Sequence, residues 1–254
     1  SLFTGLSVVM GAYIGTTVTG LLVSISSVGG GNSFDISLIF MLLAFVGVVL
    51  SFFKKDLVKH IGEICSGLGL LFFGLYTLKG SFADLKDPIQ SIFYVVNNPL
   101  LLLFIGVILT MLVQSSSAST GIMIVMCASG AVNVSSAIYV ALGATIGTVF
   151  TTLIASIGSN TNGKRLGVVA LLLRTIIGLL FLAIIWPIDI ATNFIQNLAD
   201  LFGASNYGLF IALFMVVYNI LTMLIASLFI ERLEKLGNKL IKDKEQEKLA
   251  SFVK

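Results

Sequence analysis

A run of polar residues interrupts a long apolar segment near the middle of this 254-residue chain. The segment covers residues 100–131, and within it Gln114, Ser115, Ser116 and Ser117 supply an amide and three hydroxyl groups. A polar group buried without a hydrogen-bond partner costs about 1–3 kcal/mol. Side chains of this kind are therefore expected to be packed in protein or to line a solute pathway. Their oxygens are hard ligands that suit Na⁺, and a helix N-terminus with hydroxyl groups suits an oxyanion.

A second set of hydroxyl groups lies in a sequence that occurs twice. Residues 11–25 match residues 143–157 at nine of fifteen positions, the identities being Gly, Ala, Ile, Gly, Thr, Thr, Leu, Ser and Ile. Each copy carries two threonines three residues apart, Thr16 with Thr19 and Thr148 with Thr151. This spacing places both hydroxyl groups of a pair on one face of a helix. The match indicates an internal duplication.

The elements that must position these residues are apolar helices. The chain is 57% hydrophobic and 11% charged, whereas a soluble domain has about 25% charged residues. A polytopic membrane protein is predicted, and the net charge of +3 gives no reason to expect nucleic acid as a partner. The expected helical segments are residues 2–28, 36–53, 61–82, 100–131, 134–157, 166–185 and 207–230, with shorter interfacial segments at 85–97 and 189–202.

The serine-containing segment is too long to be one straight span. As a single helix of 32 residues it would be about 48 Å long, against a hydrocarbon core of about 30 Å. A re-entrant hairpin folded at the serines fits the length. It also fits the charges, because the basic clusters at Lys54, Lys55 and Lys59 and at Lys164 and Arg165 fall on one side of the membrane only if the segment makes no net crossing.

The same orientation makes the two copies of the repeat run in opposite directions. Inverted repeats with interrupted helices are typical of secondary transporters. The predicted fold is an all-α polytopic membrane protein, an inverted-repeat transporter with a re-entrant Gln-Ser-Ser-Ser hairpin. We expect the first repeat to end within residues 1–53 and the second to occupy residues 54–187. Residues 188–230 then hold an interfacial helix and the last span, and residues 231–254 form a charged cytoplasmic tail.

Other chemistry finds little support. Two cysteines, Cys65 and Cys127, lie in apolar segments, and the single histidine, His60, lies in a basic loop. An enzyme is not expected, since the serines have no neighbouring histidine or lysine to act as a base. Arg174 lies within a predicted span, where a charged side chain costs free energy, so a functional role is the first hypothesis for it. Two roles stay open for it: a counter-charge for an anion, or a side chain that extends to the membrane surface.

At these motifs the sequence resembles the sodium-dependent phosphate cotransporter family, the type II Na⁺/phosphate group with its bacterial relatives. That family carries two inverted repeats, each with a Gln-Ser-Ser-Ser hairpin followed by a Gly-Ala-Asn-Ile-Gly-Thr-Thr helix. The parts of this chain that carry the resemblance are residues 114–118, 11–19, 143–151 and 67–75, together with Tyr218 and Asn219.

The resemblance implies a Na⁺-coupled symporter that imports inorganic phosphate across the cell inner membrane by alternating access. It implies a phosphate site at Gln114, Ser115, Ser116, Ser117 and Thr16, with Asn219 as a further site residue; Arg174 is added as a candidate because of its charge within a span and not from the resemblance. It implies Na⁺ ligands at Gln114, Ser115, Thr148, Thr151 and Thr19.

This sequence departs from the family pattern in several places. The first Gln-Ser-Ser-Ser hairpin is absent, so we expect an N-terminal portion to precede Ser1. The asparagine of the Gly-Ala-Asn motif is Tyr13 in one copy and Thr145 in the other. Where the helix after the second repeat has a histidine and an asparagine in the family, this chain reads Leu-Leu-Leu-Arg at residues 171–174.

The resemblance also bears on partners. Bacterial relatives continue into a cytoplasmic domain similar to a phosphate-signalling regulator, for which residues 231–254 would be a linker, and a homodimer is left open. Two alternative functions remain at this point: a membrane phosphate sensor or scaffold without net transport, and a symporter of another oxyanion.

Overall fold

The computed structural model describes residues 2–27 and 36–241, and in these residues the chain is helical throughout, without strands. Five of the described helices are long and apolar enough to cross a membrane, which confirms an all-α polytopic membrane protein. These are α1 (Leu2–Ser27), α3 (Asp56–Asp84), α7 (Val134–Ser156), α8 (Thr161–Thr192) and α10 (Tyr207–Leu228). The others are α2 (Ile36–Ser51), α4 (Lys86–Val95), α5 (Pro99–Val113), α6 (Ser116–Ala128), α9 (Phe194–Asp200), the short 3₁₀ helix η1 (Ala204–Asn206) and α11 (Ile230–Leu240).

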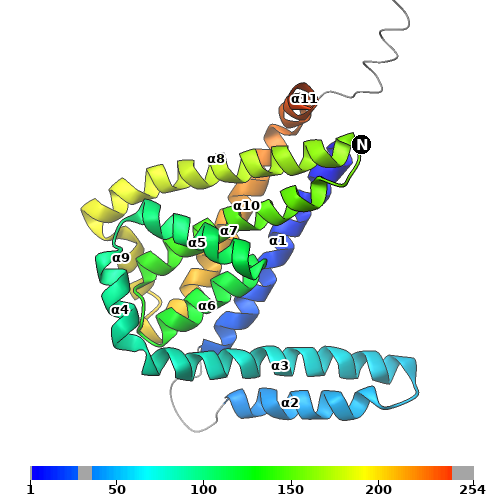
Figure 1. Cartoon of the computed structure of the whole chain (residues 1–254). Coiled ribbons are helices and arrows are strands. Elements are labelled where there is room, and N and C mark those ends of the chain that lie inside the picture. Colours follow the sequence, from blue (N-terminus) through cyan, green and yellow to red (C-terminus); the bar gives the residue numbers. More distant parts are fainter. Residues whose placement is uncertain (1, 28–35, 242–254) are drawn as a thin grey trace, which may run out of the picture.

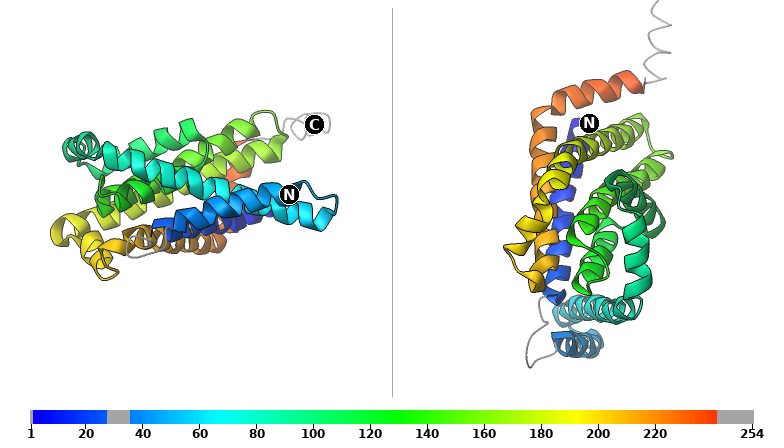
Figure 2. Two further views of the ribbon diagram at one scale, coloured as in Figure 1. Left: turned by 90° about the horizontal axis from the view of Figure 1, so that it is seen from below. Right: turned by 90° about the vertical axis from the view of Figure 1, so that its left-hand side faces the viewer.

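Helix α7 lies at the centre of the molecule. It contacts α5, α6, α8, α9 and α10, and most of its residues are buried. Helices α1 and α10 lie side by side beside this group, and α2 and α3 form a hairpin across the far end of α1 (Figures 1 and 2). Many apolar side chains of α2 and α3 are exposed, as expected for helices that face lipid.

The polar run breaks its segment into two short helices. Gln114 adopts the left-handed conformation with φ 57° and ψ 22° and ends α5, and Ser115 begins α6. With 15 and 13 residues, the two helices are about 22 and 20 Å long, each shorter than a bilayer core. The chain turns back at the break, and both helices pack on α7 (Figure 1). The structure therefore has the predicted break, while its re-entrant placement in a bilayer stays a prediction.

Close packing of α5 on α7 depends on glycine. A Cβ atom at Gly143 would fall onto the backbone oxygen of Leu103, and one at Gly106 would fall onto that of Val140. At Gly147 the added atom would lie 2.6 Å from the backbone oxygen of Val107. Small residues at these positions let the two backbones touch, as they do in membrane helix pairs generally.

The two copies of the repeat lie in α1 and α7. Near the start of α1, Gly5 faces Leu166 of α8, and near the end of α7, Ser156 packs against Gly167 of α8. The start of α1 and the end of α7 therefore lie at the same end of the molecule, and the two helices run in opposite directions (Figure 1). This supports the predicted inversion, while a twofold relation between whole repeats stays a prediction. The predicted turn at residues 29–33 and most of the charged tail lie outside the described residues.

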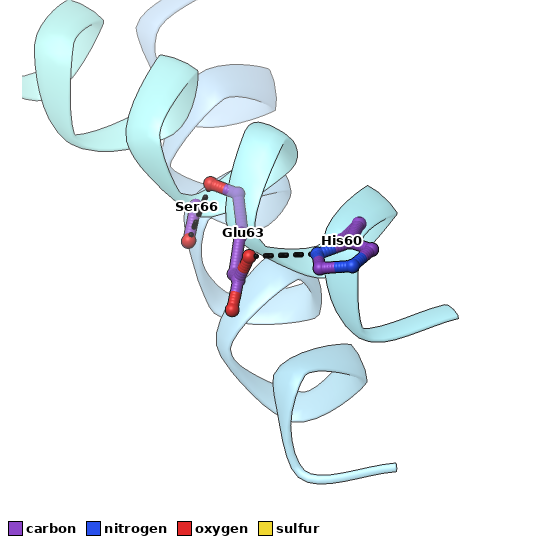
Figure 3. A network of polar contacts seen from close by, with 3 residues as sticks. All are labelled: His60, Glu63 and Ser66. Carbon is purple, nitrogen blue, oxygen red and sulfur yellow. Dashed lines mark hydrogen bonds and ion pairs between the residues drawn. The ribbon is translucent and has the colours of Figure 1, made fainter. Parts of the chain in front are cut away.

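Two helices extend beyond their predicted ends. Helix α8 runs past the predicted end at residue 185, through Trp186 and Pro187, to Thr192; helices of membrane proteins tolerate proline in this way. Helix α3 begins at Asp56, so His60 lies in a helix and not in a loop. Its Nδ1 atom is 3.2 Å from Oε2 of Glu63 on an exposed face, and the Ser66 hydroxyl donates to the Glu63 carbonyl (Figure 3).

The duplicated glycines provide a matched pair for testing the α5–α7 contact. Gly143→Ala places a methyl group on the Leu103 carbonyl, whereas a Cβ atom at its counterpart Gly11 would meet nothing within 4 Å. Overpacking costs about 1–3 kcal/mol or more, while alanine is favoured over glycine in an open helix position by about 1 kcal/mol. We expect Gly143→Ala to lower the thermal unfolding temperature of the detergent-solubilised protein and its folded yield, and Gly11→Ala to leave both unchanged or higher. Equal behaviour of the two variants would contradict this packing.

Candidate functional site

Five helices meet at a polar cavity beside the break between α5 and α6. Its lining comes from α1, α6, α7, α8 and α10. The residues with polar side chains in this lining are Tyr13, Thr16, Thr17, Ser116, Ser117, Thr120, Thr145, Thr148, Arg174 and Asn219. Both copies of the repeat contribute, since Thr16 of α1 and Thr148 of α7 are equivalent positions in them.

The N-terminus of α6 forms one side of the cavity. Ser115 caps the helix, its hydroxyl oxygen accepting from the backbone N–H of Ala118 at 3.2 Å. Ser116 and Ser117 occupy the first two helical positions, where backbone N–H groups have no partner within the helix. The Ser117 hydroxyl lies 3.5 Å from the backbone oxygen of Thr16, so the cap region of α6 adjoins the repeated motif of α1. Such a helix start favours a negatively charged ligand.

The threonines on the other side present oxygen acceptors. Thr16 donates its hydroxyl hydrogen to the Tyr13 carbonyl at 2.9 Å, Thr145 donates to Leu142 at 2.7 Å, and Thr148 donates to Ala144 at 3.0 Å. A hydroxyl group has one hydrogen and two lone pairs. With the hydrogen used by its own helix, the oxygens of Thr16 and Thr148 are left free to accept from a donor or to bind a cation, whereas the Thr145 oxygen also lies 3.5 Å from the Tyr218 hydroxyl.

Asn219 adds an acceptor of the same kind. Its side-chain nitrogen donates to the Met215 carbonyl at 2.8 Å, while its Oδ1 atom is buried and has no hydrogen-bond partner among the described residues. The residue is 4% exposed. A buried carbonyl oxygen that faces a polar cavity without a partner is a candidate ligand for a hard cation such as Na⁺.

Arg174 is the charged residue of the cavity. It lies 13 positions after the start of α8, about 20 Å along the helix, and is 4% exposed. Its Nε and Nη1 atoms are buried without hydrogen-bond partners among the described residues. Its Cζ atom lies 3.6 Å from the ring centroid of Tyr13 on α1. The side chain therefore turns into the bundle and does not extend along α8 to the membrane surface.

The cavity brings together most of the predicted site residues, but not all of them. Ser116, Ser117, Thr16, Thr148, Arg174 and Asn219 line it, whereas Gln114, Ser115, Thr19 and Thr151 do not. Gln114 is exposed because its left-handed backbone conformation ends α5 there. The Ser115 hydroxyl is occupied as the cap of α6. Thr19 lies between the lining residues Thr17 and Gly20 but on another side of α1, and Thr151 lies one turn beyond the last lining residue of α7, Thr148.

Sequence reasoning missed four polar lining residues: Tyr13, Thr17, Thr120 and Thr145. The repeat contained a signal for two of them, because Tyr13 and Thr145 occupy the same position in the two copies. That position precedes the Thr16 and Thr148 position by one helical turn, so it faces the same way. Thr17 and Thr120 are buried polar residues that nothing in their spacing distinguished from helix-packing threonines.

One protein-family model and several known proteins match the sequence of this chain. The family model described as Na⁺/Pi-cotransporter matches residues 1–80 and 86–209. Human sodium-dependent phosphate transport protein 2B is 31% identical over 169 residues, which are 63% of this chain and 24% of that protein. The uncharacterized protein YqeW of Bacillus subtilis is 25% identical over 225 residues, 87% of this chain and 69% of that protein.

A third relative covers almost the whole chain. The putative inorganic phosphate export protein YjbB of Salmonella typhimurium is 24% identical over 247 residues, 95% of this chain and 42% of that protein. This chain thus spans about a quarter of the human relative and less than half of the Salmonella one. No solved structure matches the chain. The family model covers most of the sequence, including both copies of the repeat, the serine-containing break and Arg174, and the chain therefore belongs to the Na⁺/Pi-cotransporter family.

Proposed function

We propose that the cavity is the substrate site of a Na⁺-coupled symporter that imports inorganic phosphate by alternating access. One observation carries the proposal. Hydroxyl groups from both copies of the repeat, the start of a broken helix and an unpaired guanidinium line the same cavity inside an apolar bundle. Membership of the Na⁺/Pi-cotransporter family supports it, as does the similarity to the human sodium-dependent phosphate transport protein 2B.

Phosphate is assigned to the side of the cavity that offers hydrogen-bond donors. These are the first N–H groups of α6, the hydroxyl group of Ser116 and the guanidinium of Arg174, whereas the Ser117 hydroxyl donates to the Thr16 carbonyl. An unpaired charge within an apolar bundle costs at least a few kcal/mol. A bound oxyanion would remove that cost through charge-assisted hydrogen bonds, in which arginine is especially effective.

Na⁺ is assigned to the side that offers acceptors. Thr16, Thr148 and Asn219 each use their polar hydrogens within their own helix and leave oxygen lone pairs toward the cavity. Cation coupling is also needed energetically, because each elementary charge moved across 100 mV is worth about 2.3 kcal/mol. A multivalent anion entering against a negative-inside potential therefore requires accompanying cations.

Alternating access would follow from movement between the two copies of the repeat. The site lies between α1 on one side and the α5, α6 and α7 group on the other, and it could open to either face as these move relative to each other. We place the protein in the cell inner membrane with its C-terminus in the cytoplasm.

Transport itself can be tested in proteoliposomes. The full chain should catalyse exchange of external labelled phosphate for internal unlabelled phosphate, and the exchange should require Na⁺ on both sides of the membrane. An inward Na⁺ gradient should drive accumulation, and a Na⁺ ionophore should abolish it. Phosphate binding without any exchange would contradict transport and favour a sensor. Stronger competition by sulfate than by unlabelled phosphate would contradict the choice of anion.

A second test concerns the cation ligands. Thr148→Val removes a lining hydroxyl while keeping the branched shape, and Thr151→Val makes the same change one turn further along α7, outside the lining. We expect Thr148→Val to raise the Na⁺ concentration for half-maximal uptake by about tenfold or more, the effect of losing one ligand oxygen worth about 1.4 kcal/mol. Thr151→Val should change it less than threefold. The reverse order of effects would restore Thr151 as the Na⁺ ligand.

A further inference from the structure

The contact between Arg174 and Tyr13 leads to an inference about how the anion is bound, and this inference rests on the proposed function. The guanidinium carbon lies 3.6 Å from the centroid of the Tyr13 ring, close enough for a cation–π interaction. Both residues line the cavity, and both are at least nine-tenths buried. They also come from different helices, α1 and α8, so the contact joins the first copy of the repeat to the helix that follows the second copy.

Arg174 has no carboxylate partner in the described part of the chain. The ion pair in that part joins His60 and Glu63 on the exposed face of α3. The acidic residue on the same helix, Asp189, is 15 positions further along and accepts hydrogen bonds from the Tyr139 hydroxyl and the Ile195 backbone. Tyr13 therefore occupies the place that an acidic side chain takes in most buried arginine pairs.

An aromatic ring and a carboxylate hold an arginine in different ways. A carboxylate neutralises the charge and takes up the N–H groups at the edge of the guanidinium. A ring contacts the flat face, and it leaves both the charge and the edge N–H groups free. The unpartnered Nε and Nη1 atoms of Arg174 are consistent with contact through the face.

We propose that Tyr13 is a positioning residue for anion binding, which holds the Arg174 guanidinium in the cavity through its ring and keeps its N–H groups available for an oxyanion. We assign this role to the ring, although the phenolic hydroxyl group of Tyr13 also interacts with Arg174. Without the ring, the long arginine side chain gains other rotamers and spends less time at the site, so the anion binds more weakly.

The test separates the ring from the hydroxyl group. Inorganic phosphate, with inorganic sulfate in parallel, is titrated into the detergent-solubilised full chain in the presence of Na⁺, and the rise in unfolding temperature is followed. Tyr13→Phe should need within about threefold of the wild-type anion concentration for half of the maximal rise. Tyr13→Leu should need at least about tenfold more, and Tyr13→Trp should recover the wild-type value.

Controls distinguish positioning from a general structural effect. Phe181→Leu makes the same ring-to-leucine change on α8, at a side chain that packs on Tyr218 and Phe214 outside the cavity lining. It should lower the unfolding temperature without anion but leave the half-effective concentration unchanged. Arg174→Lys keeps a positive charge and loses the planar group, and it should abolish most of the anion-dependent rise.

Three outcomes would overturn the proposal. They are weak anion binding by Tyr13→Phe, which would assign the role to the hydroxyl group; unchanged or tighter binding by Tyr13→Leu; and absence of any anion-dependent rise in the wild type. Anion binding with the expected order of variants but no Na⁺-dependent exchange would leave this inference standing and refute the proposed transport function.

Discussion

A buried guanidinium that has no carboxylate partner among residues 2–27 and 36–241 is the constraint on which the rest of the site depends. Arg174 is placed well inside α8, where water does not reach most of its surface. The bundle can contain it only because the neighbouring helices supply a ring at its face and a polar cavity at its edge. An apolar lining would make the same charge cost several kcal/mol more. Polar groups from five helices converge at this place, and the fold has to be rigid enough to keep them together.

Rigidity comes from the central helix. Helix α7 is buried along most of its length. Glycines at its contact with α5 let the two backbones touch, and this contact fixes the position of α7. The same helix carries Thr145 and Thr148 toward the cavity. The repeated Gly-x-x-x-Gly-Thr pattern therefore serves packing and chemistry together in α7. In α1 the equivalent glycines, Gly11 and Gly15, have open space around them among the described residues, so there the pattern makes no comparable packing contact.

The sequence predicted the helical architecture well because apolar length is a strong signal in a membrane protein. The break at Gln114 and Ser115 was predictable for two reasons. A helix of 32 residues is longer than the bilayer core is thick, and the polar side chains of a Gln-Ser-Ser-Ser run would lack hydrogen-bond partners in lipid. The ends of the helices were predicted less accurately, since Pro187 lies inside α8 and His60 lies inside α3. A local signal such as proline or charge is weaker than the hydrogen bonding that continues a helix through it.

Within the site, the sequence distinguished positions by residue type but not by side-chain direction. The i, i+3 spacing of Thr16 with Thr19, and of Thr148 with Thr151, correctly places each pair on roughly one face. Only the first member of each pair lines the cavity, because the lining face of α1 passes through residues 13, 16, 17 and 20 and leaves Thr19 to one side, while on α7 the lining ends at Thr148. The repeat marked the position of Tyr13, but its role could not be predicted from the sequence. Its importance depends on Arg174, 161 positions away in the chain (174 − 13), and neither residue shows its partner until α1 and α8 are packed together.

The hydrogen bonds inside each helix explain how one small cavity can suit ions of opposite sign. A threonine in a membrane helix satisfies its hydrogen on its own backbone, as Thr16, Thr145 and Thr148 do. It then faces the cavity as an acceptor, and Asn219 does so through its amide oxygen. Donors come only from groups that cannot satisfy themselves in this way, which are the start of α6 and the guanidinium of Arg174. The division between an acceptor side and a donor side therefore follows from helix geometry: continuous helices supply the acceptors, while a broken helix and one unpaired arginine supply the donors.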